Sequence, residues 1–201
     1  MIKTASVILA HPYKKSFNHA IFDTSVKTLT DLGVHVCAHD LYEESFNPVL
    51  TTEELGKQPT KDPLVSKYVQ ELIESDLLIF IHPNWWGQPP AILAGYVDRV
   101  IRPPHAYDFD PNDSSAAPWG KLTEKGALVF NTSNTDAARE TGYFHDPLES
   151  LWGRCVFGFC GLENYSRRMF RIISESDDAQ RKGWLAETAE IIKNFGDYPK
   201  K

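Results

Sequence analysis

The sequence predicts a doubly wound α/β domain built on a five-stranded parallel sheet with helices on both faces. Five short apolar runs alternate with segments whose apolar residues have helical spacing. Such alternation is typical of a parallel sheet, because a crossover between parallel strands is usually a helix. Five strands favour the order 2-1-3-4-5 over the six-stranded order of dinucleotide-binding domains. The chain of 201 residues suits a single domain, which we expect to span residues 1–201.

The predicted strands are residues 6–10, 34–38, 77–81, 126–131 and 165–173. Helical spacing predicts helices at residues 17–32, 64–74, 91–101, 147–159 and from Ser176 onward. Gly33 can end the first helix and Ser176 can cap the last one. Pro103 and Pro104 must stop the third helix, because neither can donate a backbone hydrogen bond. The residues from there to Gly120 are rich in Pro, Asp and Ser and form an excursion from the sheet.

Composition excludes several classes of function. A net charge of −6 argues against nucleic acid or an anionic membrane as the main partner. No apolar run approaches the roughly 18 residues of a membrane helix, and no signal peptide is visible, so we expect a cytoplasmic protein. Three cysteines without close metal spacing predict neither a disulfide framework nor a metal site. Cys155 and Cys160 are near enough in sequence to be a redox pair, but buried structural thiols are the favoured interpretation.

Polar segments follow the first, third and fourth predicted strands, and these strand ends meet at the switch point of a doubly wound sheet, where ligands bind. The first segment, residues 10–18, lacks the glycine-rich nucleotide fingerprints. It ends at a helix N-terminus, where free N–H groups and the Ser16 hydroxyl can hold a phosphate. His11 can add a donor. Taken alone, each residue has a simpler explanation: Ser16 caps the helix, and His11 is a hydrogen-bonded loop histidine.

The second segment reads Pro83-Asn84-Trp85-Trp86-Gly87-Gln88-Pro89-Pro90-Ala91-Ile92. Aromatic planes on a stiff loop suit a flat, conjugated ligand. The alternative is that both tryptophans are core side chains covering the sheet. The third segment, residues 131–135, offers backbone N–H groups and polar side chains to a bound heterocycle, unless it is an ordinary polar turn. The convergence of all three segments favours a ligand site over the separate structural explanations.

These segments resemble the NAD(P)H:quinone oxidoreductases of the DT-diaphorase type, which include short bacterial members. The resemblance rests on residues 7–12 with 16–20 and on residues 40–42 with 46–48. Its most specific part is Pro83-x-x-Trp86, followed by Pro90-Ala91-Ile92-Leu93-x-Gly95 and Asp98-Arg99-Val100. The resemblance implies a flavodoxin-like fold, a homodimer, and hydride transfer from NAD(P)H to quinones or similar flat, electron-poor acceptors. It also implies a bound flavin. FAD is favoured over FMN because Ser16-Phe17-Asn18 is similar to the FAD-binding members.

The resemblance also implies roles for single residues. Those expected to hold the flavin phosphates and their extension are His11, Ser16, Phe17, Asn18 and Ala20. Those expected along one edge of the flavin ring are Pro83, Asn84, Trp85 and Trp86, and those along the other are Asn131, Thr132, Ser133 and Asn134. Tyr143 and His145 are the nearest equivalents of a tyrosine and a histidine that stabilise the reduced flavin in the family, at a shorter spacing. The family has a glycine-rich loop in place of residues 131–134, and an aromatic residue often stands in place of Gly87.

Other functions stay open at this point. A nitro- or azo-reductase on the same scaffold differs only in its acceptor, and a flavin-binding regulatory subunit of a transporter would make catalysis secondary. A one-electron carrier ranks last, because such domains are usually more acidic and lack the tryptophan-proline string. NADH and NADPH are not distinguished. Arg167, Arg168 and Arg171 can meet a 2′-phosphate, but solvent-facing charges on an edge strand explain them better.

Overall fold

The computed structural model describes residues 2–110, 112 and 117–195. Its centre is a five-stranded sheet in the order β2-β1-β3-β6-β7, and every neighbouring pair is parallel. The predicted parallel sheet and its order, counted over these five strands, are therefore confirmed. The strands are β1 (Thr4–Leu9), β2 (His35–Asp40), β3 (Leu77–Pro83), β6 (Gly126–Ser133) and β7 (Asn164–Arg171).

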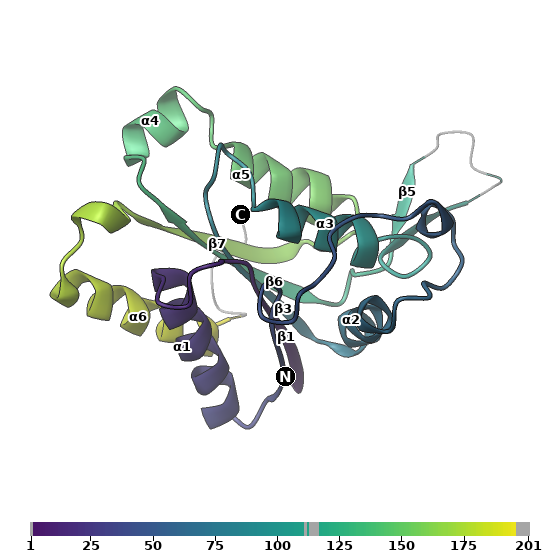
Figure 1. Ribbon diagram of the computed structural model, residues 1–201, viewed down its shortest axis with the longest axis horizontal. Coiled ribbons are helices and arrows are strands. Elements are labelled where there is room, and N and C mark those ends of the chain that lie inside the picture. The colour runs from purple at the N-terminus through teal and green to yellow at the C-terminus, as the bar shows by residue number, and fades with distance from the viewer. Residues whose placement is uncertain (1, 111, 113–116, 196–201) are drawn as a thin grey trace.

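Helices pack on the sheet through two separate apolar clusters. Ile8 and Phe80 belong to one cluster, whereas Val7 and Ile79, their neighbours in sequence, belong to the other. Because successive side chains of a strand point to opposite faces, the clusters lie on opposite faces of the sheet. Figure 1 shows the corresponding layers. One cluster takes side chains from α1 (Phe17–Asp31) and α6 (Asp178–Lys193), and the other from α2 (Pro63–Glu74), α3 (Ala91–Val100) and η2 (Ser150–Gly158).

Short elements account for the main differences from the predicted secondary structure. The excursion after α3 contains an antiparallel hairpin of β4 (Tyr107–Phe109) and β5 (Pro118–Gly120). The predicted helix 147–159 is a single turn, α5 (Pro147–Glu149), that continues as the π-helix η2. Helix α6 is capped by Asp177, whose carboxylate accepts from the Gln180 N–H, and not by Ser176 as predicted. The remaining short helices are η1 (Thr52–Leu55), α4 (Ala137–Gly142) and η3 (Ile173–Glu175).

Two central strands continue past their last apolar residue. In register, His82 pairs with Asn131 and Pro83 pairs with Thr132. The polar residues Asn131, Thr132 and Ser133 are therefore buried strand residues rather than a loop. The polar segment that reaches the sheet edge after β6 is correspondingly shorter than predicted.

The long connection after β2 is held against α3 by one buried arginine. Arg99 donates from Nε and Nη2 to the Glu54 carboxylate at 2.9 and 2.8 Å, and from Nη2 to Asp62 at 3.1 Å. Gly95, one turn earlier on α3, lets the connection pass, because a Cβ there would lie 2.2 Å from the Pro48 carbonyl oxygen. Gly95 and Arg99, two residues of the motif on which the family resemblance rests, therefore have structural roles. Within the described ranges, no helix has both the length and the apolar character needed to cross a membrane.

Candidate functional site

The carboxyl ends of β1, β3 and β6 open into a pocket of about 430 Å³. We call it the phosphate-side pocket, because the N-terminus of α1 lies in its wall. It brings together most of the residues that the sequence predicted for a cofactor site: His11, Ser16, Phe17, Asn18, Pro83, Asn84, Trp85, Thr132, Ser133 and Asn134. Its other lining residues are Tyr13, Lys15 and Thr135, which belong to the predicted segments 10–18 and 131–135, and Ile173 and Arg181, which the sequence did not indicate. Lys15 and Arg181 make this wall cationic.

Three residues of the predicted set do not line this pocket. Ala20 lies in the first turn of α1, and its N–H donates to the Ser16 carbonyl at 3.4 Å. Asn131 is fully buried beneath the site, where its amide Nδ2 donates to His82 Nε2 at 2.9 Å. Trp86 lines a second, adjoining hollow of about 790 Å³. We call this second hollow the ring-side pocket; it shares Asn84, Asn134 and Thr135 with the first.

The tryptophan turn carries backbone strain at the wall of the ring-side pocket. Trp86 has a φ of 58°, a left-handed conformation that is rare for a bulky residue, and its side chain is 98% exposed. Gly87 follows with a φ of 73°, and a Cβ there would lie 2.5 Å from Pro147 Cγ. No larger residue fits at Gly87 while Pro147 holds this position. Strain of this kind is maintained at functional sites when the surrounding contacts impose it.

Those contacts come from Asn84 and Glu140. The Asn84 N–H donates to the Thr132 carbonyl at 2.7 Å, and its Oδ1 accepts from the Gly87 N–H at 3.0 Å. Its Nδ2 donates to the two carboxylate oxygens of Glu140 at 3.0 and 3.1 Å. Glu140 is 1% exposed and lines the ring-side pocket with Phe144. No periodicity or motif marked Glu140 in the sequence; only the fold of residues 137–146 brings it here.

The start of α1 presents polar groups to the phosphate-side pocket. Ser16 caps the helix by accepting from the His19 N–H at 3.3 Å, as its capping role predicted. The N–H groups of Phe17 and Asn18 precede any intrahelical acceptor, so they are available to a ligand. Asn18 is 2% exposed; its Nδ2 donates to Thr132 Oγ1 at 2.9 Å, and its Oδ1 has no hydrogen-bond partner among the described residues. A buried acceptor without a partner is costly, so a ligand donor at this point would be favourable.

His11 faces the same pocket as a neutral donor. Its Nδ1 accepts from the Tyr13 N–H at 3.1 Å, which leaves the proton on Nε2. Burial, followed by electrostatic interaction with nearby His19, lowers the pKa of His11. The ring also packs against Trp85, with centroids 5.9 Å apart. His11 is therefore a hydrogen-bonded loop histidine, as the simpler explanation held, and it lines the predicted pocket as well.

A buried polar cluster supports the floor of the site. Asn131 Nδ2 and Trp152 Nε1 both donate to His82 Nε2, and burial lowers the pKa of His82 to about 4, so this ring is neutral. Arg167 Nη1 donates to Asn131 Oδ1 at 3.2 Å, and the same guanidinium pairs with Asp146 and Glu149. The Arg167 side chain is only 5% exposed. The prediction that Arg167 faces solvent is therefore wrong, although β7 is an edge strand as expected.

Tyr143 and His145 lie on the segment between α4 and α5, and neither lines either pocket. Tyr143 is 74% exposed, and the Arg139 guanidinium lies 5.9 Å from its ring centroid. His145 and Asp146 have φ values of 58° and 46°, so the segment turns sharply just before α5. Phe144 and Glu140, rather than the two predicted residues, face the ring-side pocket.

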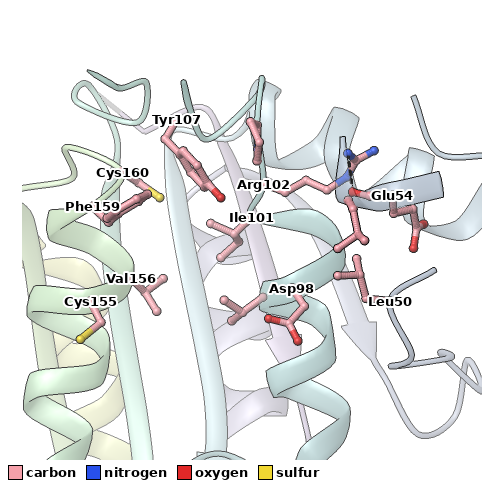
Figure 2. Close-up of a pocket in the computed structure, with 13 residues that line it drawn as sticks. Leu50, Glu54, Asp98, Ile101, Arg102, Tyr107, Cys155, Val156, Phe159 and Cys160 are labelled. Atoms are coloured by element: carbon pink, nitrogen blue, oxygen red, sulfur yellow. Dashed lines mark hydrogen bonds between the residues drawn. The ribbon is translucent and has the colours of Figure 1, made fainter. Parts of the chain in front are cut away.

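A third pocket, of about 430 Å³, shares no residue with these two (Figure 2). Cys155 and Cys160 both line it, the first exposed and the second buried. Burial raises the pKa of Cys160 to about 12, so this thiol does not ionise near neutral pH, as a redox pair would need. Cys160 fits the predicted buried thiol, whereas Cys155 is not buried. Over the described part of the chain, no group of three or more potential metal ligands gathers in one place.

Comparisons with known proteins agree with this geometry. The model of a family with a flavodoxin-like fold matches residues 3–192. An uncharacterised NAD(P)H oxidoreductase from Haemophilus influenzae is 33% identical over 195 residues, which cover 92% of this chain and 91% of the relative. NAD(P)H dehydrogenase (quinone) 1 from Cavia porcellus is 32% identical, with 98% of this chain and 78% of the relative covered. The solved structure of Smu.1420 from Streptococcus mutans superposes with a TM-score of 0.82 at 29% identity and covers 95% of this chain and 99% of its own. The chain therefore belongs to the NAD(P)H:quinone oxidoreductase family of flavodoxin-like proteins.

Proposed function

We propose that this protein is a flavin-dependent NAD(P)H oxidoreductase that reduces quinones, or similar flat electron-poor acceptors, by two electrons. The observation that carries the proposal is the convergence of three polar segments, from β1, β3 and β6, on one pocket with a buried, unpartnered acceptor in its wall. The family relatives named above as NAD(P)H oxidoreductase and NAD(P)H dehydrogenase (quinone) support the same activity.

The residues present fit a flavin. The first N–H groups of α1, with Lys15 and Arg181, suit an anionic phosphate. Asn18 Oδ1 suits a hydroxyl donor of the ribityl chain, because it is a buried acceptor without a partner in the part of the chain that the structure describes. Pro83–Trp85 and Thr132–Asn134 stand on the two sides where the ring system would enter. The flavin, when bound, supplies the chemistry of accepting and passing on a hydride, and the protein supplies position and electrostatics.

We propose FAD rather than FMN as the resident flavin. Ser16-Phe17-Asn18 is similar to the FAD-binding members of the family. Lys15 and Arg181 add two cations beside the helix N-terminus, which suits a pyrophosphate better than a single phosphate. Identification of FMN as the released cofactor would contradict this choice without affecting the assigned activity.

The ring-side pocket is the proposed site for nicotinamide and acceptor in turn. Trp86 and Phe144 offer aromatic surface, and Glu140 and Asn84 fix the turn that carries the exposed indole. We further propose that the polar groups of Thr132, Ser133 and Asn134, which line the phosphate-side pocket, stabilise the charge that develops on the ring system. We propose that Tyr143 and His145 stabilise the reduced flavin with them, acting from the segment that bounds this pocket, and that the histidine also moves the proton that accompanies the hydride.

We propose that the protein works as a homodimer in the cytoplasm. Four large apolar side chains are exposed in or near the third pocket. Leu55 and Phe159 line it (Figure 2 shows Phe159), and Phe109 and Trp119 belong to the hairpin of β4 and β5, whose Tyr107 also lines it. A second copy of the chain would cover them. Three free thiols fit a reducing compartment.

The experiment that tests the function is purification followed by identification of the cofactor and assay with a quinone. We expect a yellow protein that releases FAD on denaturation and oxidises NADH or NADPH only when a quinone is present. A colourless protein that takes up neither FAD nor FMN would contradict the proposal. Tight flavin binding without turnover would instead support a regulatory flavoprotein.

A further inference from the structure

Ser16, the capping residue of α1, is tied to a histidine–aspartate pair at the wall of the phosphate-side pocket. Ser16 Oγ lies 2.9 Å from His19 Nδ1, and His19 Nε2 lies 3.1 Å from Asp40 Oδ2. Asp40 Oδ1 accepts from the N–H groups of Tyr42 and Glu43 at 3.0 and 3.3 Å. Because it accepts at both oxygens, Asp40 acts as a carboxylate, and His19 Nε2 must carry the proton of the bond between them.

The protonation of His19 therefore depends on Nδ1 alone, and it decides what Ser16 can offer to a ligand. With a neutral ring, Nδ1 is an acceptor, and it takes the only proton of the Ser16 hydroxyl. Ser16 Oγ then has no proton to give to the pocket. With a charged ring, Nδ1–H donates to Ser16 Oγ, which already accepts from the His19 N–H. Both lone pairs are then engaged, and the hydroxyl proton is released for another acceptor.

We propose that His19 takes up a proton when the phosphate group of the cofactor docks at the start of α1, so that His19 and Asp40 are positioning residues for the cofactor. This inference rests on the flavin assigned under the proposed function. A phosphate oxygen near Ser16 can only accept, so it needs the hydroxyl proton that a neutral His19 withholds. The phosphate charge also favours the imidazolium, while Asp40 fixes the ring so that Nδ1 faces Ser16.

The other charged groups around His19 are consistent with this assignment. From the loop after β1, the His11 ring lies 6.3 Å away and is kept neutral by burial. The same loop supplies Lys14, which pairs with Glu43 of the turn after β2, and Lys15, which lines the pocket. On α1 itself, the next charged residue is Asp23, one turn later. Asp40 is the one charged side chain bonded to His19 among the contacts of the described residues.

Isothermal titration calorimetry tests the proposal. The full chain, freed of flavin, is titrated from pH 6.5 to 8.5 with the flavin that co-purifies, in two buffers of different ionisation enthalpy. We expect an uptake approaching one proton per flavin in the upper part of this range, with Kd weakening by up to about tenfold per pH unit. The second ionisation of the FMN phosphate lies near pH 6, so above pH 7.5 this phosphate is already ionised. It therefore does not contribute to the number of protons taken up on binding. Riboflavin, which lacks the phosphate, is expected to bind without proton uptake.

Three variants locate the proton. In His19→Asn the amide supplies a permanent N–H donor to Ser16, so we expect flavin binding with no proton uptake and little dependence on pH. Ser16→Ala removes the coupling and is also expected to abolish uptake. His11→Asn is the matched control, because it changes the other histidine near the pocket. We expect it to weaken flavin binding while the proton uptake on binding remains. Far-ultraviolet circular dichroism checks that each variant is folded.

The outcomes separate this inference from the proposed function. Flavin binding by the unaltered protein without proton uptake anywhere from pH 6.5 to 8.5 would overturn the role of His19 and leave the activity standing. Uptake that persists in folded His19→Asn, or an equal uptake with riboflavin, would overturn it as well. Failure to bind any flavin would instead overturn the proposed function.

Discussion

At the level of single residues, the site depends most on Asn84. This one side chain, with its own backbone N–H, contacts β6 through Thr132, the tryptophan turn through Gly87, and α4 through Glu140. It also lines both pockets. The sequence predicted Asn84 as a site residue from the resemblance, but its partner Glu140 lies 56 positions away and only the folded chain reveals the pair.

Replacing Asn84 should therefore destabilise the protein and impair turnover together. In Asn84→Ala, the buried Glu140 carboxylate and the Gly87 N–H lose their partners, which costs about 1–3 kcal/mol per group left unsatisfied. We expect the urea midpoint to fall and kcat with a quinone to drop at least about tenfold as the Trp86 turn loosens. The control is Glu140→Gln, which keeps an oxygen acceptor for Asn84 and should stay within about 1 kcal/mol of the parent protein. An Asn84→Ala protein with parental stability would show that this network does not hold the turn.

Tyr143 and His145 allow a cleaner separation of chemistry from folding, because both side chains are exposed. We expect Tyr143→Phe and His145→Gln to leave stability unchanged within about 0.5 kcal/mol. If these residues donate the proton that accompanies hydride transfer, stopped-flow reduction of the flavin by NAD(P)H should slow by about a hundredfold or more. Unchanged reduction in both variants would remove them from the mechanism and make Glu140, a carboxyl group in the wall of the ring-side pocket, the next residue to test.

At the level of elements, apolar periodicity in the sequence predicted the main strands and helices. It did not predict the elements that carry no such periodicity. The five main strands and α1, α2, α3 and α6 are all present near their predicted bounds. The hairpin of β4 and β5 has no strand pattern in the sequence, because each strand has three residues and one begins with proline. The π-helix η2 has the apolar spacing of an ordinary helix, so its different hydrogen bonding is not readable. The predicted fourth strand ends at Asn131, two residues short, because the polarity of Thr132 and Ser133 hides the strand that continues through them.

The connection containing η1 should make folding stability depend on acid. The Arg99 guanidinium, followed by a hydrogen bond from Thr60, holds the pKa of the Glu54 carboxyl at about 2, below its ordinary value of 4.5. A lowered pKa means that the stabilisation is fully present above about pH 4.5 and is lost as pH falls towards 2. The shift corresponds to about 3 kcal/mol.

Denaturation of Glu54→Gln tests this dependence. The variant leaves the buried Arg99 with Asp62 as its remaining carboxylate partner, so we expect a loss of about 2–4 kcal/mol at pH 7. Between pH 4.5 and 2.5, the parent protein should lose this difference progressively, and the two unfolding curves should converge. A constant difference across that range would contradict the assigned ion pair.

At the level of the whole molecule, the strand order creates the site. Segments that begin at residues 10, 83 and 131 meet because β1, β3 and β6 are neighbours in a parallel sheet, with their carboxyl ends at one edge. The sequence predicted this convergence from topology alone, without knowledge of any side-chain contact. Strain at Trp86, the buried Asn18 Oδ1 and the floor made by Arg167 depend on packing between distant residues, which one sequence does not display.

The exposed apolar side chains near the third pocket lead to the prediction for assembly. Leu55 is 70% exposed and Trp119 is 65% exposed, and Phe159 lies in the pocket wall at 37%. Clusters of this kind are unusual on a monomer surface and are typical of contacts between subunits. Light scattering should therefore give a mass twice that of one chain.

The double variant Leu55→Glu with Phe159→Glu should shift the protein towards monomer, because two carboxylates would be desolvated in the contact. Leu32→Glu changes a leucine that is 53% exposed and does not line this pocket, so it should leave the mass unchanged. A dimer unaffected by the double variant would place the subunit contact on another face, and a monomeric parent protein would end the dimer hypothesis.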